Sequence, residues 1–182
     1  MISEHPDKSE ELLRQAGVTD NAWLDAVRQH HEFMDGAGYP QGLKGEAISR
    51  LARVIKLADI YCALVSGRAY RTAMLQNSAM RELFMQRGKQ VDGQLTEQFV
   101  KVVGIYPPGT FVRLANAEIA VATRHGASAS APMVQSVVGP RGSPLAVYGK
   151  RDCGKADFAI REVISKAQAN VKINRHMLWG YE

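Results

Sequence analysis

The sequence predicts a mainly helical domain over residues 1–108, followed over residues 109–182 by a small antiparallel β region and a C-terminal helix. In the first half, apolar residues recur at helical spacing around one glycine-rich loop. After Tyr106-Pro-Pro-Gly109 the chain changes to short β-rich runs separated by turn residues. With 182 residues, 46% of them apolar, the chain is long enough to bury a core.

The helices are expected in a simple order. Pro6 fits the first turn of one helix, and Asp20 can cap a second whose apolar side runs to Met34. A third extends from about Ile48 to Ser66. Two shorter amphipathic stretches follow, over residues 79–84 and 95–103. Together these segments make the first half a helical domain.

Four β-rich runs follow, and turn residues such as those of Gly139–Pro144 separate them. The runs are Phe111–Leu114, Glu118–Arg124, Pro132–Val138 and Leu145–Tyr148. We expect them to form one antiparallel sheet. A last helix is expected over Phe158–Ala167.

Composition narrows the class of protein. No apolar run approaches the roughly 18 residues of a membrane span, and the N-terminus is too polar for a secretory signal. Cys62 and Cys153 lie far apart in the sequence, as two reduced thiols of a cytoplasmic protein would. A net charge of +5 favours anionic partners, but no helix-turn-helix or RNA-recognition motif is present, so nucleic acid is not an expected partner.

Polar side chains occupy apolar positions on two predicted helices. His30 and His31 end the apolar stripe of the second helix, and His5 opens the first. Asp59 falls on the apolar stripe of the third helix and is therefore expected to point toward the core. The other members of that stripe are Ile48, Leu51, Ala52, Ile55, Cys62 and Ala63.

Two explanations fit a buried carboxylate next to imidazoles. An unpaired buried charge costs several kcal/mol, on the order of the desolvation penalty of one ion. Asp59 and the histidines can therefore be ligands of a divalent metal, since these donors suit first-row ions. Alternatively, Asp59 pairs with a buried arginine or histidine, and His30 and His31 are ordinary core or helix-end residues.

The loop Asp35–Leu43 contains three glycines and a proline, which allow close backbone approach around Tyr39. It can hold an aromatic ring over a ligand, or it can be a simple interhelical connection. Beyond the third helix, Arg68 and Arg71 lie three residues apart. Their guanidinium groups suit phosphate oxygens, although surface arginines are common.

Taken together, these motifs resemble the HD-GYP family. The run His30-His-Glu-Phe-Met-Asp-Gly-Ala-Gly-Tyr-Pro-Gln-Gly-Leu-Lys-Gly-Glu-Ala-Ile48 is similar to its HHExxDGxGYPxGLxGxxI signature. Arg53–Tyr61 and Arg68–Arg71 resemble the next two blocks, and His5-Pro6 resembles the pair that opens the preceding helix.

The resemblance implies a helical HD-superfamily bundle with a centre of two or three iron or manganese ions. It implies hydrolysis of cyclic di-GMP to the linear dinucleotide pGpG or to GMP in bacterial signalling. By motif position the metal ligands are His5, His30, His31 and Asp59. Tyr39 would lie against the nucleotide, and Arg68 and Arg71 would hold its phosphates.

The sequence also departs from the family pattern. None of the histidines is followed by aspartate, although a His-Asp pair gives the family part of its name. Cys62 stands where the family usually has aspartate. Either the cysteine simply fills apolar space, or the chain has lost a group that orients a metal ligand.

We therefore expect the upstream half of the domain to be absent. Four ligands would remain where a complete centre has about twice as many. We then expect weak metal binding and little phosphodiesterase activity. We also expect the exposed apolar surface to associate with the missing half or with a second copy of the chain. The alternative is a degenerate module that binds a nucleotide or a signalling protein without catalysis. An in-phase His-Asp pair upstream in the gene would favour the phosphodiesterase.

Overall fold

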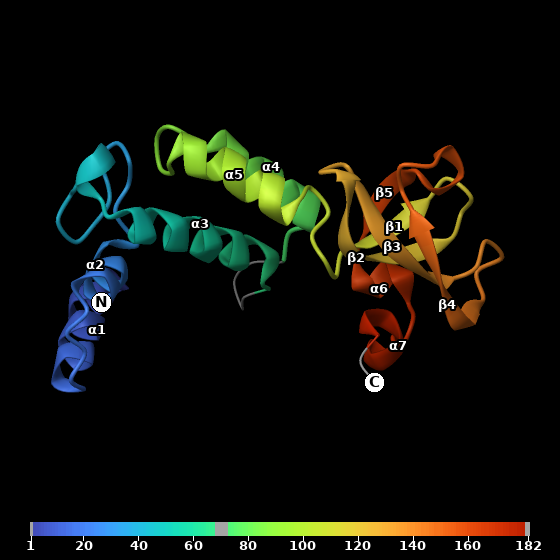
Figure 1. Ribbon diagram of the computed structural model, residues 1–182, viewed down its shortest axis with the longest axis horizontal. Helices are drawn as coiled ribbons and strands as arrows, with labels where there is room; N and C mark the ends of the chain where they lie inside the picture. The colour runs from blue at the N-terminus through green and yellow to red at the C-terminus, as the bar shows by residue number, and fades with distance from the viewer. Residues whose placement is uncertain (1, 68–72, 181–182) are drawn as a thin grey trace. The chain divides into compact units, whose positions relative to one another are not determined.

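The computed structural model describes residues 2–67 and 73–180. Its contacts divide the chain into two compact units (Figure 1). The helical unit comprises Met1–Ala73 and Ala79–Phe99, and the β unit comprises Met74–Ser78 and Val100–Glu182. A helical first part followed by a small β region confirms the predicted fold class.

A 3-10 turn at Ile2–Glu4 opens the helical part, and another lies at Gly45–Ala47. The longer helices are α1 (His5–Gln15), α2 (Asn21–Gln29), α3 (Arg50–Val65), α4 (Gln76–Met85) and α5 (Gly93–Val103). Asp20 caps α2, as predicted, because its carboxylate accepts the backbone N–H groups of Ala22 and Trp23. Ser49 caps α3 in the same way through the backbone N–H of Ala52. These caps fix where the two helices begin. None of the described helices is long and apolar enough to cross a membrane.

The inward face of α3 differs from the predicted one. Its buried residues are Ala52, Lys56, Leu57 and Leu64. Leu51 is 50% exposed, Ile55 is 41% exposed, and Asp59 and Cys62 are also exposed. The prediction that Asp59 points into the core is therefore wrong. The described chain covers Ile48 and Ala52 of the predicted stripe but leaves most of its later members exposed.

The β unit contains one five-stranded sheet with the order β4-β3-β2-β1-β5, antiparallel throughout. Its strands are β1 (Phe111–Leu114), β2 (Ile119–Ser128), β3 (Ala131–Val138), β4 (Pro144–Asp152) and β5 (Ile160–Ile164). The four predicted runs are confirmed as β1 to β4. Beyond β5 lie two short helices, α6 (Lys166–Ala169) and α7 (Arg175–Trp179).

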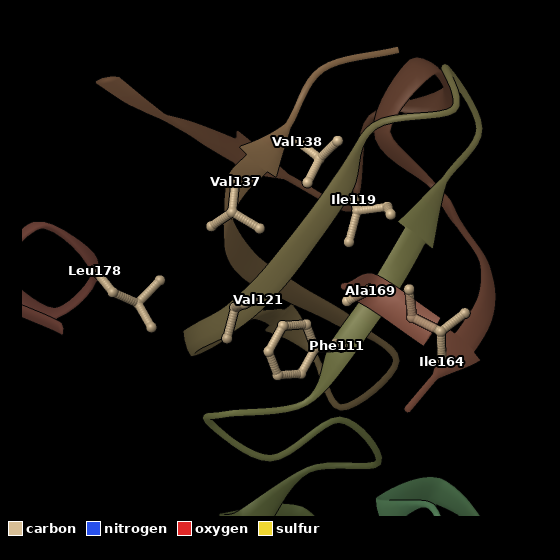
Figure 2. Packing of buried hydrophobic residues seen from close by; sticks show 8 residues of the cluster. All are labelled: Phe111, Ile119, Val121, Val137, Val138, Ile164, Ala169 and Leu178. Carbon is tan, nitrogen blue, oxygen red and sulfur yellow. The ribbon is translucent and has the colours of Figure 1, made fainter. Parts of the chain in front are cut away.

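Successive residues of β1 pack on opposite faces of the sheet. Phe111 joins Val121 in one buried cluster, and α6 and α7 contribute Ala169 and Leu178 to it (Figure 2). Val112 belongs to a second cluster with Ala120, Val134 and other residues. The two short C-terminal helices therefore cover one face of the sheet.

The predicted helix over Phe158–Ala167 is wrong. Residues Ala156–Phe158 form a 3-10 turn, and strand β5 occupies Ile160–Ile164. This strand pairs with β1, where Ile164 lies opposite Phe111 and is buried. Its β-branched residues suit a strand, and the outer edge of β1 supplies the partner that local periodicity does not reveal.

A buried carboxylate just before β2 forms hydrogen bonds with side chains of β3 and β4. Glu118, which is 7% exposed, accepts a hydrogen bond from the Ser136 hydroxyl. It also accepts two from the guanidinium of Arg151, each at 3.0 Å. A bidentate partner of this kind satisfies a buried carboxylate. Glu118 thus links the start of β2 to β3 and β4.

Candidate metal centre

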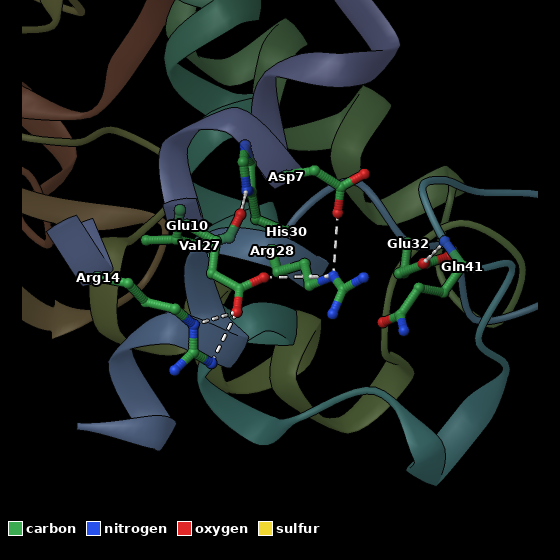
Figure 3. Close-up of polar contacts among 8 residues, drawn as sticks. All are labelled: Asp7, Glu10, Arg14, Val27, Arg28, His30, Glu32 and Gln41. Atoms are coloured by element: carbon green, nitrogen blue, oxygen red, sulfur yellow. Dashed lines mark hydrogen bonds and ion pairs between the residues drawn. The ribbon is translucent and has the colours of Figure 1, made fainter. Parts of the chain in front are cut away.

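The candidate centre is built on an antiparallel pair of helices, α1 and α2. Arg28 near the end of α2 contacts two carboxylates in the first two turns of α1, that of Asp7 at 3.0 Å and that of Glu10 at 3.4 Å (Figure 3). The pairing aligns the beginning of α1 with the end of α2. His5, the first residue of α1, therefore meets His30 and His31, which directly follow α2.

Three imidazoles meet at this end of the pair. The Nε2 atoms of His5 and His30 lie 3.4 Å apart. The ring centroids of His30 and His31 are 4.1 Å apart, and those of His5 and His31 are 4.8 Å apart. One nitrogen from each ring can be chosen so that all three lie within 4.8 Å of one another. Such a group can supply three nitrogen ligands to a single ion.

A backbone contact orients the His30 ring. Its Nδ1 lies 2.6 Å from the carbonyl oxygen of Val27 (Figure 3). A carbonyl can only accept, so Nδ1 carries the proton and donates it. Nε2 therefore presents its lone pair toward His5. Metal-binding histidines commonly have this arrangement, in which a backbone carbonyl fixes the tautomer.

The glycine-rich loop places Tyr39 against the histidines. Its ring stacks on that of His31, with centroids 4.8 Å apart and planes 19° from parallel. The backbone N–H of Tyr39 also donates to the carbonyl of His31 at 3.4 Å. Gly38 is required beside it, because a Cβ there would lie 2.3 Å from the backbone nitrogen of Phe33. The loop is thus folded closely onto the end of α2.

Glu32 anchors the far side of this loop. Its carboxylate is 1% exposed and accepts the backbone N–H groups of Gln41 at 2.6 Å (Figure 3) and of Leu43 at 3.0 Å. These two hydrogen bonds satisfy the buried carboxylate and hold the end of the loop against Glu32, the residue that follows His31. Glu32 lies inside the histidine motif, but no pattern in the sequence alone assigned it a role.

Lys56 of α3 places a buried cation beside the centre. The residue is 6% exposed, and its ammonium donates to the carbonyl of His30 at 3.4 Å. It also lies 4.2 Å from the centroid of the Phe33 ring. Burial lowers the pKa of Lys56 to about 8, and the charges of Asp59 and Glu32 oppose that change. A lysine in an apolar run is the clue to this position that sequence reasoning missed.

Asp59 lies near the histidines even though it is exposed. Its charge acts on His31, where it opposes the other influences on the pKa. Burial raises the pKa of Tyr39, and Asp59 raises it further. Asp59 is not within the group of three mutually close ligand atoms. The structure thus brings three of the four predicted ligands together and leaves the carboxylate at the margin. Arg68 and Arg71 lie outside the described residues.

The electrostatics of the centre favour a neutral His31. Burial, followed by the charges of His30, Lys56 and His5, lowers the pKa of His31 to about 4. A neutral imidazole is the form that binds metal, so no proton has to be displaced from this ring at neutral pH. The donors present fit one first-row divalent ion, with three nitrogens and a carboxylate nearby.

The loop anchor makes a first prediction. Glu32→Ala removes the buried carboxylate that accepts two backbone N–H groups, which should cost about 1–3 kcal/mol of local stability. Hydrogen exchange measured by NMR should then be faster at the amides of Gln41 and Leu43. Glu97→Ala, an exposed glutamate of α5, is the matched control and should leave both amides unchanged. Unchanged exchange in Glu32→Ala would contradict the anchoring role.

The charges around His31 make a second prediction, tested by NMR titration of its ring in metal-free protein. Lys56→Met removes a cation and should raise the pKa of His31, whereas Asp59→Asn removes an anion and should lower it. Because the folded pKa lies below the ordinary value of about 6.5, the folded protein should lose stability as the pH falls from that value toward 4. Lys44→Met, at an exposed lysine, is the control. Shifts in the opposite directions would contradict this geometry.

Comparison with known proteins agrees with the motifs. Residues 1–95 match the family model described as HD domain. A cyclic di-GMP phosphodiesterase of Pseudomonas aeruginosa is 36% identical over 136 residues, which cover 74% of this chain and 33% of that protein. The cyclic di-GMP phosphodiesterase response regulator RpfG of Xanthomonas campestris is 38% identical over 56% of this chain and 27% of its own length. This chain therefore spans a third or less of these relatives.

Among solved structures, a cyclic GMP-AMP specific phosphodiesterase of V. cholerae aligns with a TM-score of 0.45 and 22% identity. The alignment covers 54% of this chain and 23% of that one. The family model matches more than half of the residues, and these relatives are named as phosphodiesterases. The chain belongs to the HD domain family, and its GYP-bearing motifs place it in the HD-GYP group.

Proposed function

We propose that this chain is the GYP-bearing part of a metal-dependent phosphodiesterase that hydrolyses cyclic di-GMP to pGpG or GMP. The observation that carries the proposal is the meeting of His5, His30 and His31 with Tyr39 stacked on the last of them. Relatives that are 36% and 38% identical to this chain are named as cyclic di-GMP phosphodiesterases. In this proposal the ion is iron or manganese.

The chain's own side chains have distinct roles in the proposal. His5, His30 and His31 hold the ion, and Asp59 is the fourth ligand. When bound, the ion supplies a Lewis acid for the phosphoryl oxygen and activates water. The Val27 carbonyl keeps the His30 ring oriented, while the buried Lys56 keeps positive charge next to a site that takes a phosphodiester.

Tyr39 gives the nucleotide an aromatic surface. Its ring is half-buried against His31, and Glu32 holds the loop that carries it. A base can stack on the free side of such a ring. Arg68 and Arg71 are assigned to the phosphates from their motif alone, since both lie outside the described residues.

The exposure of Asp59 favours a second candidate function. With three nitrogen ligands close together and the carboxylate at the margin, the chain by itself holds fewer donors than a two-metal reaction requires. A module that binds the nucleotide through Tyr39 without cleaving it would have the same geometry. Binding and turnover therefore have to be measured separately.

The test uses the full chain with cyclic di-GMP and added manganese or iron(II). We expect binding but little turnover. Tyr39→Ala should weaken binding by roughly 5- to 150-fold, the equivalent of about 1–3 kcal/mol for one stacked base, and Tyr39→Phe should retain it. Equal affinities for Tyr39→Ala and the unchanged protein would contradict the assignment of the loop.

Turnover decides between the two candidates. Slow metal-dependent hydrolysis that His30→Ala abolishes and His125→Ala preserves would identify a part of a phosphodiesterase, whereas fast hydrolysis would contradict the expected weakness of this chain. His125 is a suitable control because it belongs to the β unit. Binding without hydrolysis under every metal condition would favour the non-catalytic module.

A further inference from the structure

The positive charge of the chain is concentrated in its β unit. Residues 100–182 contain eleven lysines and arginines but five aspartates and glutamates. Residues 1–99 contain twelve against thirteen. The surplus of +5 thus belongs to the part of the chain that the proposed phosphodiesterase centre does not use.

Part of this charge surrounds a cavity at the face of the sheet that carries α6 and α7. The cavity has a volume of about 580 Å³. Phe111 of β1 and Val121 of β2 contribute to its apolar lining, as does Trp179 of α7. Figure 2 shows the two sheet residues on the face that Ala169 and Leu178 cover. Three cations complete the polar part of the lining: Lys166, Lys172 and Arg175.

These cations are available to a ligand. Lys166, Lys172 and Arg175 are exposed, and none of them forms an ion pair within residues 2–67 and 73–180. The described lining of the cavity includes no aspartate or glutamate. Cations that converge without a counter-charge create a positive potential, which favours an anionic ligand over a neutral or cationic one.

Trp179 also lines a second, smaller cavity of about 190 Å³. Arg124 of β2 and Lys150 of β4 belong to that cavity, and its described lining again lacks acidic residues. The side-chain amide of Gln135 donates to the carbonyl of Leu178 at 2.8 Å and so holds α7 on the sheet. One half-buried indole is therefore shared by two cavities that each carry cations.

We propose that this surface of the β unit binds a nucleotide of one or two units, with a base against Trp179 and phosphate oxygens on Lys172 and Arg175. An aromatic ring beside a basic groove is the combination that binds unpaired nucleotides. Guanidinium and ammonium groups suit phosphate oxygens. The larger cavity lies within the range of about 300–1,000 Å³ that is usual for small-molecule sites. The residues of this site belong to the β unit, whereas the three clustered histidines belong to the helical unit.

The experiment measures the affinity of pGpG and of GMP for the full chain by calorimetry, with EDTA present to remove metal. The double variant Lys172→Glu/Arg175→Glu should raise the dissociation constant at least roughly tenfold, because two phosphate contacts are lost. Lys155→Glu/Arg161→Glu makes the same change of net charge at exposed cations outside the described cavities and should alter affinity less than about twofold. Circular dichroism checks that both variants fold.

Two further measurements separate a nucleotide site from a general attraction for anions. Trp179→Phe should retain binding, whereas Trp179→Ala should weaken it, and a tetraglutamate peptide should compete poorly. Equal weakening by both double variants, or equal competition by the peptide, would overturn the proposal. His31→Ala tests whether the nucleotide instead binds at the histidines, because it removes the ring on which Tyr39 stacks. Loss of binding in His31→Ala would place the nucleotide at the histidines instead and would also contradict the second site.

Discussion

The close approach of three imidazoles at the end of one helical pair is the constraint on which the rest of the helical unit depends. Positively charged rings this close would repel one another at short range, whereas one shared cation could be held by a nitrogen of each ring. The lowered pKa of His31, which burial causes first and its neighbours reinforce, is the consequence in the metal-free chain.

The surrounding residues preserve this arrangement. Arg28 aligns α1 with α2 through two carboxylates, and the Val27 carbonyl sets the tautomer of His30. Glu32 secures the loop that stacks Tyr39 on His31. None of these groups needs to touch a ligand to matter, because each helps to fix the position of a ring in the centre. The centre is therefore organised by the chain before any ligand arrives.

Much of this could be predicted from sequence because the evidence is local. The main helices and strands were predicted from helix caps such as Asp20, from helical spacing and from β-rich runs. Helical periodicity also predicted that His30 and His31 lie together at the end of one apolar stripe. The meeting with His5 depends on pairing between helices, so the family motif was needed to expect it. Asp59 shows the limit of periodicity, which reveals that a helix face is apolar but not whether anything covers it.

The same limit explains the other misses. Strand β5 forms because the edge of β1 is available, and that is a property of the sheet and not of residues 160–164. Lys56 and Glu32 are buried through contacts with other segments, so their roles appear only in three dimensions. The sequence places the surplus charge in residues 100–182, but only the folded β unit shows that five of those cations line the two cavities that share Trp179.

Paramagnetic broadening by manganese tests the central claim most directly. As Mn²⁺ is added in substoichiometric amounts, the imidazole NMR signals of His5, His30 and His31 should broaden before those of the other histidines. The signals of Asp59 should broaden with them. His125 and His176, which belong to the β unit, should stay sharp. Broadening that begins at His125 or His176, or that spares the three clustered rings, would contradict a metal centre at this site.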